Sequence, residues 1–452
     1  MRCQHSIPET HPDFRRGTLK PVEVVLLQGD GRVKIFAALI LAVMVAGCGG
    51  GSTPLSPSPA GPSTALRMTT AERTHVRPAY SVLYSFKGGN DGRDPHAGPL
   101  IKVKGTLYGT TVYGGGPCHD RCFGGTVFAI TTSGTETVLH SFAVGSGDGT
   151  NPRAGLINVT GTLYGTTVHG GSASCYCGTV FKVTLSDAET VLHNFAGAPD
   201  GFGPDANVLD VNGTLYGTTI NGGANGDGTV FAITPSGTET VLHSFAGKPD
   251  GAHPYAGLIH VNGTLYGTTT SGGANCSSSG GCGTVFTITT SGAETVLYSF
   301  KGGSGDGKNP TQAALLDVNG TLYGTNKRGG TNNLGTVFSI TTSGKESVLH
   351  SFGGSADGVF PYGGLLNVNG TLYGTTSNGG SVSCGVRYGD VHGCGTVFKT
   401  TTSGNETVLH SFGGSGDGRY PYAGLINVNA MLYGTTTAGG AKDAGTVFSL
   451  SP

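Results

Sequence analysis

The sequence predicts an all-β protein, a seven-bladed β-propeller with four antiparallel strands in each blade. Three observations lead to this prediction. The segments Leu-Tyr-Gly and Gly-Thr-Val-Phe each recur seven times, about 50 to 60 residues apart, which is a period typical of propellers and solenoids. Each repeat contains four short runs rich in β-branched and aromatic residues, joined by tight turns. The last repeat ends one run early, and a matching run precedes the first repeat.

The repeat at residues 206–245 shows these four runs most clearly. Asn212-Gly213 predicts a tight hairpin, because a type I′ turn needs positive φ at both central residues. The runs are apolar on both sides, which fits sheets packed face to face between two neighbours. The four expected strands are Val208–Val211, Thr214–Thr219, Thr229–Thr234 and Glu239–Phe245.

The phase of the repeats predicts how the ring closes. A β-solenoid or a string of separate sheets is the alternative, but an isolated four-stranded sheet would leave apolar faces and strand edges bare. Ser81–Phe86 matches a fourth strand, and Gly445–Leu450 matches a third strand. We therefore expect the N-terminal strand 81–86 to pair with Thr446–Leu450 and complete the last blade. The small Gly and Ala residues before each first strand suit a crowded centre. The repeats, residues 80–452, form one domain.

The residues before the repeats have a different character. Residues 1–32 hold charges without periodicity, and we interpret them as an upstream extension, with translation starting at Val33. Residues 33–47 have a basic start, a short apolar run and small residues before Cys48, the pattern of a bacterial lipoprotein signal peptide. A chance apolar stretch with a free cysteine is the alternative. Cys48 is the expected lipidation site, and residues 48–79, rich in Gly, Ser and Pro, are the expected disordered tether.

Eight of the ten cysteines form pairs within the repeats. Each pair lies in the loop between the second and third strands. An exported protein meets an oxidising compartment, so each pair predicts a disulfide that clamps its own loop. Zinc ligation by Cys118, His119, Asp120 and Cys122 is an alternative for the first pair. The expected disulfides are Cys118–Cys122, Cys175–Cys177, Cys276–Cys282 and Cys384–Cys394.

The alternating strand directions place the loops after the second and fourth strands on one face. Each repeat carries the element Asp-Gly-x-x-Pro in the loop after a fourth strand. The residue after the Pro is equivalent in every repeat but varies in identity, so we predict that this set lines the channel mouth and binds a small molecule or glycan. A solvated rim without a ligand is the alternative. The set is His96, Arg153, Asp205, Tyr255, Thr311, Tyr362 and Tyr422.

The aspartates of the same element have two interpretations. The first is an Asx turn, in which each carboxylate accepts backbone N–H bonds. The second is a Ca²⁺ site, which needs several oxygen ligands around one point. We favour the turn and predict no cofactor, with Ca²⁺ as the alternative. The aspartates are Asp91, Asp148, Asp200, Asp250, Asp306, Asp357 and Asp417. The histidines at one position of the fourth strands are interpreted as packing residues: His140, His193, His243, His350 and His410.

Several function classes find no support. The net charge of −1, with few charges of either sign, argues against a nucleic-acid partner. No unique carboxylate pair, serine nucleophile elbow or phosphate-binding loop stands out, so no catalytic residue is predicted.

The units G-T-L-Y-G-T-T, G-T-V-F-x-I-T and E-T-V-L-H-S-F resemble the bacterial GloVer tandem repeat found in choice-of-anchor proteins. The resemblance covers about residues 80–452 and implies an exported repeat protein held by a surface anchor, here Cys48. It brings no known activity or catalytic residues. The blade plan is also similar to that of kelch-type propellers, as a fold analogy only.

These observations predict a lipid-anchored binding or interaction module of the bacterial cell envelope. Its partners are the membrane, through the N-terminal lipid, and an unidentified glycan, small molecule or protein bound at the disulfide-clamped loop face. Gly49, rather than Asp, follows Cys48, which favours the outer membrane. The alternatives are an envelope enzyme (a hydrolase, lyase or quinone-type dehydrogenase) with its site at the channel mouth, and a structural surface protein.

Overall fold

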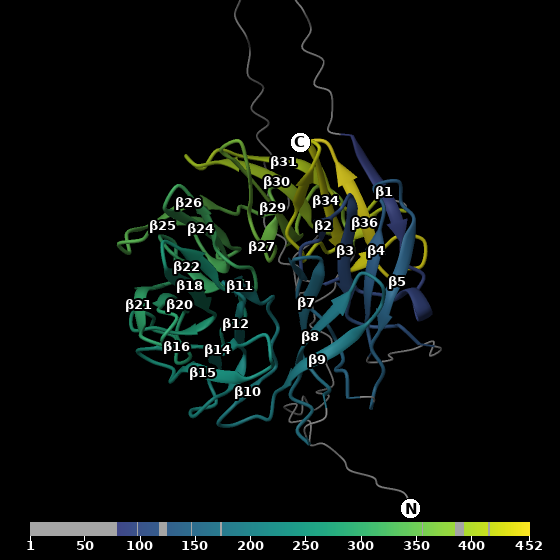
Figure 1. Cartoon of the computed structure of the whole chain (residues 1–452). Coiled ribbons are helices and arrows are strands. Elements are labelled where there is room, and N and C mark those ends of the chain that lie inside the picture. The colour runs from purple at the N-terminus through teal and green to yellow at the C-terminus, as the bar shows by residue number, and fades with distance from the viewer. Residues whose placement is uncertain are drawn as a thin grey trace, which may run out of the picture. The chain divides into compact units, whose positions relative to one another are not determined.

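The computed structural model describes residues 79–96, 98–116, 124–145, 147–171, 174–354, 356–384, 393–414 and 416–452. These residues belong to one compact unit, Arg73–Pro452. Seven antiparallel sheets form a ring in this unit (Figure 1), which confirms the predicted seven-bladed β-propeller. The one helix in the described ranges is the short 3-10 helix η1 (Gly89–Asp91), and no helix there is long and apolar enough to cross a membrane.

Every blade is built on four strands, which in blades 1 to 6 run outward in chain order from the inner strand. Blades 1 to 3 contain β2 (Ile101–Val103), β3 (Thr106–Thr111), β4 (Thr126–Ile130), β5 (Glu136–Ser141); β6 (Ile157–Val159), β7 (Thr162–Thr167), β8 (Thr179–Thr184), β9 (Glu189–Asn194); and β11 (Leu209–Val211), β12 (Thr214–Thr219), β14 (Thr229–Ile233), β15 (Glu239–Ser244). Blades 4 to 6 contain β17 (Ile259–Val261), β18 (Thr264–Thr269), β20 (Thr284–Ile288), β21 (Glu294–Ser299); β23 (Leu316–Val318), β24 (Thr321–Gly329), β25 (Thr336–Thr341), β26 (Glu346–Ser351); and β28 (Leu366–Val368), β29 (Thr371–Asn378), β30 (Thr396–Thr401), β31 (Glu406–Ser411).

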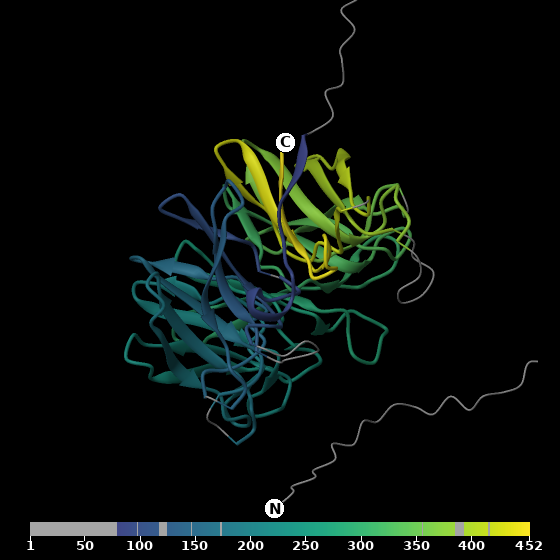
Figure 2. The same cartoon turned by 90° about the vertical axis from the view of Figure 1, so that its right-hand side faces the viewer.

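Blade 7 joins the two ends of the domain. It contains β33 (Ile426–Val428), β34 (Met431–Thr436) and β36 (Thr446–Leu450), with β1 (Tyr80–Ser85) as its outer strand. Strand β1 pairs antiparallel with β36, so that Tyr80 faces Leu450 and Ser85 faces Thr446. The purple β1 lies beside the yellow β36 in Figures 1 and 2. The predicted closure is therefore confirmed, with a strand that starts and ends one residue earlier than expected.

The Asp-Gly-x-x-Pro segment was expected to be a loop, but in five blades it also forms β structure. Residues after its Asp pair with the stretch that follows the second strand, as in Gly201 with Gly222 and Phe202 with Asn221. These segments are the ribbons β10 (Gly201–Phe202) with β13 (Asn221–Gly222), β16 (Gly251–Ala252) with β19 (Ser271–Gly272), and β32 (Gly418–Arg419) with β35 (Ala438–Gly439), and the strands β22 (Gly307–Pro310) and β27 (Val359–Pro361). The element is thereby tied to the second strand of its own blade.

Neighbouring blades pack through pairs of phenylalanines. Phe195, just after outer strand β9, meets Phe231 of β14 edge to face, with ring centroids 5.1 Å apart, and both rings are fully buried. Such a pair contributes about 0.5–1.5 kcal/mol beyond the burial of its area. The same contact recurs at all seven seams: Phe86–Phe128, Phe142–Phe181, Phe195–Phe231, Phe245–Phe286, Phe300–Phe338, Phe352–Phe398 and Phe412–Phe448.

A proline of one blade packs on a glycine of the preceding blade at each seam. Gly228 has φ +98°, and a Cβ added there would lie 2.6 Å from Cδ of Pro254, too close for any other residue. His253, which precedes the Pro, is left-handed (φ 54°) and donates its N–H to the carbonyl oxygen of Asp227 at 2.8 Å. The seven pairs are Pro95–Gly445, Pro152–Gly125, Pro204–Gly178, Pro254–Gly228, Pro310–Gly283, Pro361–Gly335 and Pro421–Gly395.

The centre of the ring is crowded, as the sequence predicts. A Cβ added to Gly155 would meet the carbonyl oxygen of Pro99 in blade 1 at 3.1 Å, and one added to Gly424 would meet that of Gly364 at the same distance. Glycine is therefore needed at these two positions before the inner strands.

Replacement of a seam glycine is expected to cost more than replacement of a turn glycine. Gly213 has φ +86° with no atom near a built Cβ, so Gly213→Ala should cost only the left-handed strain of about 1–2 kcal/mol. Gly228→Ala adds collisions with the carbonyl oxygen of Thr219 and with Pro254, and it should cost about 3 kcal/mol or more. Urea denaturation of both variants measures this difference, and equal losses would contradict the seam contact.

Candidate functional site

Most of the residues that follow a seam Pro contact or act electrostatically on one another, and this set is the predicted channel mouth. The mouth is defined here as His96, Arg153, Asp205, Tyr255, Thr311, Tyr362 and Tyr422, together with Lys327 of β24. Thr311 contributes least, because it is buried and hydrogen bonds with the hydroxyl of Thr325 at 2.8 Å. The other members form an aromatic half and a charged half.

The aromatic half comes from blades 5, 6, 7 and 1. The ring of His96 stacks on Tyr422 with centroids 4.8 Å apart and planes 14° apart. Tyr422 meets Tyr362 at 4.7 Å, and Nζ of Lys327 lies 4.8 Å from the ring centroid of Tyr362. Nδ1 of His96 lies 3.3 Å from the carboxylate of Asp94. The three rings therefore form one aromatic cluster, with the ammonium of Lys327 over the ring of Tyr362.

The charged half comes from blades 2 to 4. Nη1 of Arg153 lies 3.7 Å from Oδ2 of Asp205, whose side chain is fully buried, whereas that of Arg153 is 34% exposed. Both carboxylate oxygens of Asp205 and Nε of Arg153 are buried without a hydrogen-bond partner among the described residues. Burial raises the pKa of Asp205 to about 6, although the charges of Arg153 and His96 act in the opposite direction.

The two halves lie within electrostatic reach of each other. The charge of His96 acts on Asp205, which lies two blades away. Burial and the charge of Asp205 raise the pKa of Tyr255, and Tyr362 adds to this effect. The structure thus brings six of the seven predicted positions into mutual reach.

Backbone hydrogen bonds connect the disulfide loops to the segments that carry the mouth residues. Three predicted pairs are bonded, Cys175–Cys177, Cys276–Cys282 and Cys384–Cys394. The backbone carbonyl oxygen of the second cysteine in each bridge accepts the N–H of the residue before a seam Pro. The pairs are Cys177 with Gly203, Cys282 with Asn309 and Cys394 with Tyr420, at 2.7–2.8 Å. The clamped loops and the mouth residues are therefore held by the same backbone contacts. Cys118–Cys122, its zinc alternative and Cys48 lie outside the described residues.

The fourth-strand histidines do more than pack. His193 of β9 packs edge-on against Phe195 at 4.7 Å, and its Nε2 lies 3.3 Å from Oδ2 of Asp200. A tyrosine replaces the histidine at two seams, where Tyr84 bonds Asp91 and Tyr298 bonds Asp306. The sequence interpretation missed this bond, although a separation of seven or eight residues between the two partners recurs in each repeat.

The aspartate holds the loop that follows the fourth strand. Oδ2 of Asp200 accepts the N–H of Ala196 at 2.9 Å, and Oδ1 accepts that of Gly201 at 2.5 Å. Burial raises the pKa of Asp200, but the bonds from His193, Gly201 and Ala196 outweigh it and lower the pKa. The carboxylate is thus used inside the fold as an acceptor of backbone bonds.

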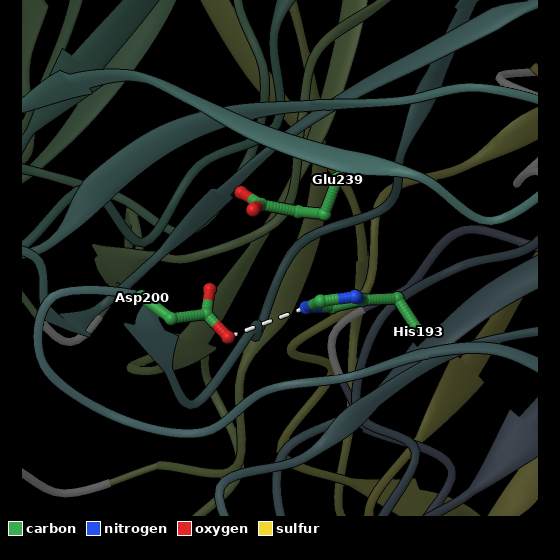
Figure 3. A group of neighbouring side chains, drawn as sticks. All are labelled: His193, Asp200 and Glu239. Atoms are coloured by element: carbon green, nitrogen blue, oxygen red, sulfur yellow. Dashed lines mark hydrogen bonds and ion pairs between the residues drawn. The ribbon is translucent and has the colours of Figure 1, made fainter.

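A glutamate from the next blade completes a seam triad. Glu239 of β15 points toward His193 and Asp200 (Figure 3), and the ligand atoms of the three residues lie within 4.8 Å of one another. Its Oε1 is buried without a hydrogen-bond partner among the described residues. Burial, helped by the charge of Asp200, raises the pKa of Glu239 to about 7. Equivalent triads are His243–Asp250–Glu294 and His350–Asp357–Glu406. Such nitrogen and oxygen sets could hold a divalent cation such as Zn²⁺.

A model of the Gloeobacter/Verrucomicrobia repeat matches residues 57–280 and 276–452, which together cover most of the chain. The chain belongs to the Gloeobacter/Verrucomicrobia repeat family. A search of curated proteins found no match to this chain.

Solved structures resemble this Gloeobacter/Verrucomicrobia repeat protein in fold alone. A gluconolactonase from Xanthomonas campestris is 12% identical, with a TM-score of 0.37, over 64% of this chain and 82% of its own. A europium-containing methanol dehydrogenase is 12% identical, with a TM-score of 0.46, over 82% and 93%. The secretion-system component PorZ of Porphyromonas gingivalis is 14% identical, with a TM-score of 0.46, over 81% and 47%.

The seam glutamates predict a stability that falls as the pH rises. The folded pKa is about 7 for Glu189, Glu239, Glu294 and Glu346 and about 8 for Glu406. These values exceed the ordinary 4.5, so the folded state binds protons more tightly between pH 4.5 and 8, and raising the pH through this range lowers the free energy of unfolding. The lowered aspartate pKa values act below pH 3.8, outside this window.

Thermal denaturation should therefore give a lower melting temperature at pH 8 than at pH 5.5. A variant with Glu189, Glu239 and Glu294 replaced by Gln should show a flatter dependence. A melting temperature that rises over this range would refute the assignment.

The chain itself suggests a tolerated replacement at the seam. His193→Tyr restores the arrangement of the Tyr84 and Tyr298 seams and should leave the free energy of unfolding nearly unchanged. His193→Ala leaves the Asp200 carboxylate, which is 18% exposed, without its side-chain donor, at a cost of about 1–3 kcal/mol. Urea denaturation compares the two variants. Equal destabilisation would show that the imidazole has a role beyond this hydrogen bond.

Proposed function

We propose that the protein is an exported, lipid-anchored binding module of the bacterial envelope that holds a small polar ligand at its channel mouth. The observation that carries this proposal is a contrast between positions of the repeat. The seams use Pro, Gly, Phe and Asp in every blade, whereas the position directly after the Pro holds five residue types. A purely structural position would be expected to repeat, as the seam positions do. The variable side chains instead converge on one another.

Unsatisfied groups at the mouth support the same proposal. A buried polar group without a partner costs about 1–3 kcal/mol, and such groups are rare in stable folds. The mouth contains three such atoms, on Asp205 and Arg153. A ligand, or water held with it, would supply the missing partner to the guanidinium.

Export and anchoring are part of the proposal. The three disulfides are typical of proteins from oxidising compartments. The lipid anchor rests on the pattern of residues 33–47 before Cys48, and outer-membrane placement on Gly49.

Catalysis at the same mouth is the second candidate. One observation favours it: the carboxyl of Asp205 has a pKa of about 6, which lets it exchange a proton near neutral pH. A hydrolase or lyase would need this carboxyl to reach the reacting atoms, and its full burial makes the binding function the better supported one.

Saturation-transfer NMR tests the proposal on the full chain in detergent, with a panel of sugars, hydroxy acids and amino acids. We expect one class to bind to the wild type and to be lost, by at least tenfold in affinity, from the double variant Arg153→Ala/Tyr422→Ala. Lys345→Ala is the matched control, since it removes an exposed cation in the turn between β25 and β26. If no class binds, or if the double variant binds as tightly as the wild type, the mouth does not bind a ligand and the proposal is wrong.

A further inference from the structure

We infer that the ligand of the channel mouth is an acidic sugar, whose ring lies on the aromatic half and whose oxyanion meets Arg153. This inference rests on the proposed binding function and narrows it to a chemical class.

The reachable polar groups of the mouth are mainly hydrogen-bond donors. The side chain of Asp205 is fully buried next to Arg153, whose side chain is 34% exposed. Asp94, the other carboxylate, is paired with His96. Lys327 has no carboxylate within salt-bridge distance in the described ranges. A ligand that enters therefore meets a guanidinium and an ammonium, which together fit an oxyanion.

Asp205 has a positioning role in this arrangement. Its Oδ2 lies 3.7 Å from Nη1 of Arg153, and this ion pair orients the guanidinium. Nε of Arg153 has no acceptor within the described part of the chain. Because Nε is buried, an incoming carboxylate would meet the Nη atoms of this partly exposed side chain.

The aromatic half fits the face of a sugar ring. His96 stacks on Tyr422 at 4.8 Å and Tyr362 meets Tyr422 edge to face at 4.7 Å, so the three rings form one aromatic cluster. None of the three is fully buried, and an aromatic surface with polar tips suits the apolar face of a pyranose bordered by hydroxyls. The chain lacks Trp, so tyrosine supplies this surface. The charge of Arg153 and Tyr362 both act on Tyr255, so we expect the cation of Arg153 to be within reach of an acidic substituent of that ring.

Isothermal titration of the full chain with galacturonic acid, galactose 6-phosphate and galactose separates the outcomes. We expect the two acids to bind at least tenfold more tightly than galactose, and the uronate more tightly than the phosphate if a carboxylate is the natural oxyanion. Half-molar NaCl should weaken the binding of the two acids and leave the affinity for galactose unchanged. Equal affinity of acids and galactose would overturn the inference and leave the binding function intact.

Variants then assign the roles. Arg153→Gln should lower the affinity for the acid about 10- to 150-fold, the range of a charge-assisted hydrogen bond, and leave galactose binding unchanged. Arg153→Gln leaves the buried Asp205 carboxylate without its ion-pair partner. Arg153→Gln/Asp205→Asn removes both charges, so it should show the same loss of affinity for the acid in a stable fold. Tyr422→Ala should weaken acid and neutral sugar alike, and Tyr422→Phe should not. Retention of the preference for acids in the double variant would overturn the inference. Binding of other panel classes but no sugar would also overturn it, and no binding at all would remove the proposed function too.

Discussion

The contact between a proline and the glycine of the preceding blade is the constraint on which this propeller depends. The proline ring fits because the glycine lacks a Cβ and adopts a φ of about 94 to 112° at the seams. Its fixed φ in turn holds the chain that enters the next inner strand. The contact between Pro95 and Gly445 is the same one, and it joins the first and last repeats without a covalent link. The closing seam therefore uses the geometry of all the others, and no blade is left with an uncovered face.

The same contact separates what must repeat from what is free to vary. The proline fixes where the next residue emerges, so the identity of that residue can change without loss of the seam. His96, Arg153 and Asp205 are three such residues in successive repeats. The residue before the seam glycine is similarly free, and it is a cysteine in the clamped loops, as at Cys177. Ligand recognition can then be built at the mouth because the rigid seams position it and place few demands on its chemistry.

Sequence reasoning predicted the strands and the closure because both depend on local or counted features. The Asn212-Gly213 turn has the positive φ values that its hairpin requires, and the phase of the repeats determined the place of β1. The His193–Asp200 bond was missed because its partners lie across a loop, where neither helical nor strand periodicity applies. Glu239 could not be assigned to the same cluster, since its approach depends on how one blade tilts against the next. The burial of each mouth residue also depends on packing between blades. The sequence could therefore not predict that Asp205 is buried and Arg153 partly exposed.

The seam between blades 6 and 7 differs from the others in a way that its electrostatics explain. At the other six seams a glutamate approaches the donor and acceptor pair of the preceding blade, and its carboxyl must either stay protonated or place a second negative charge beside the aspartate. Tyr80 occupies this position on β1, opposite Leu450, and its ring stacks on His410 at 3.8 Å. A phenol keeps the packing and stays neutral across the range in which the glutamates titrate. Strand β1 is held in blade 7 by non-covalent contacts with β36, so an acid that repelled Asp417 there would act on the strand that closes the ring. Tyr80 is thus the one residue that replaces the seam glutamate. It lies on β1, where a charge that titrates would most directly weaken the pairing that closes the ring.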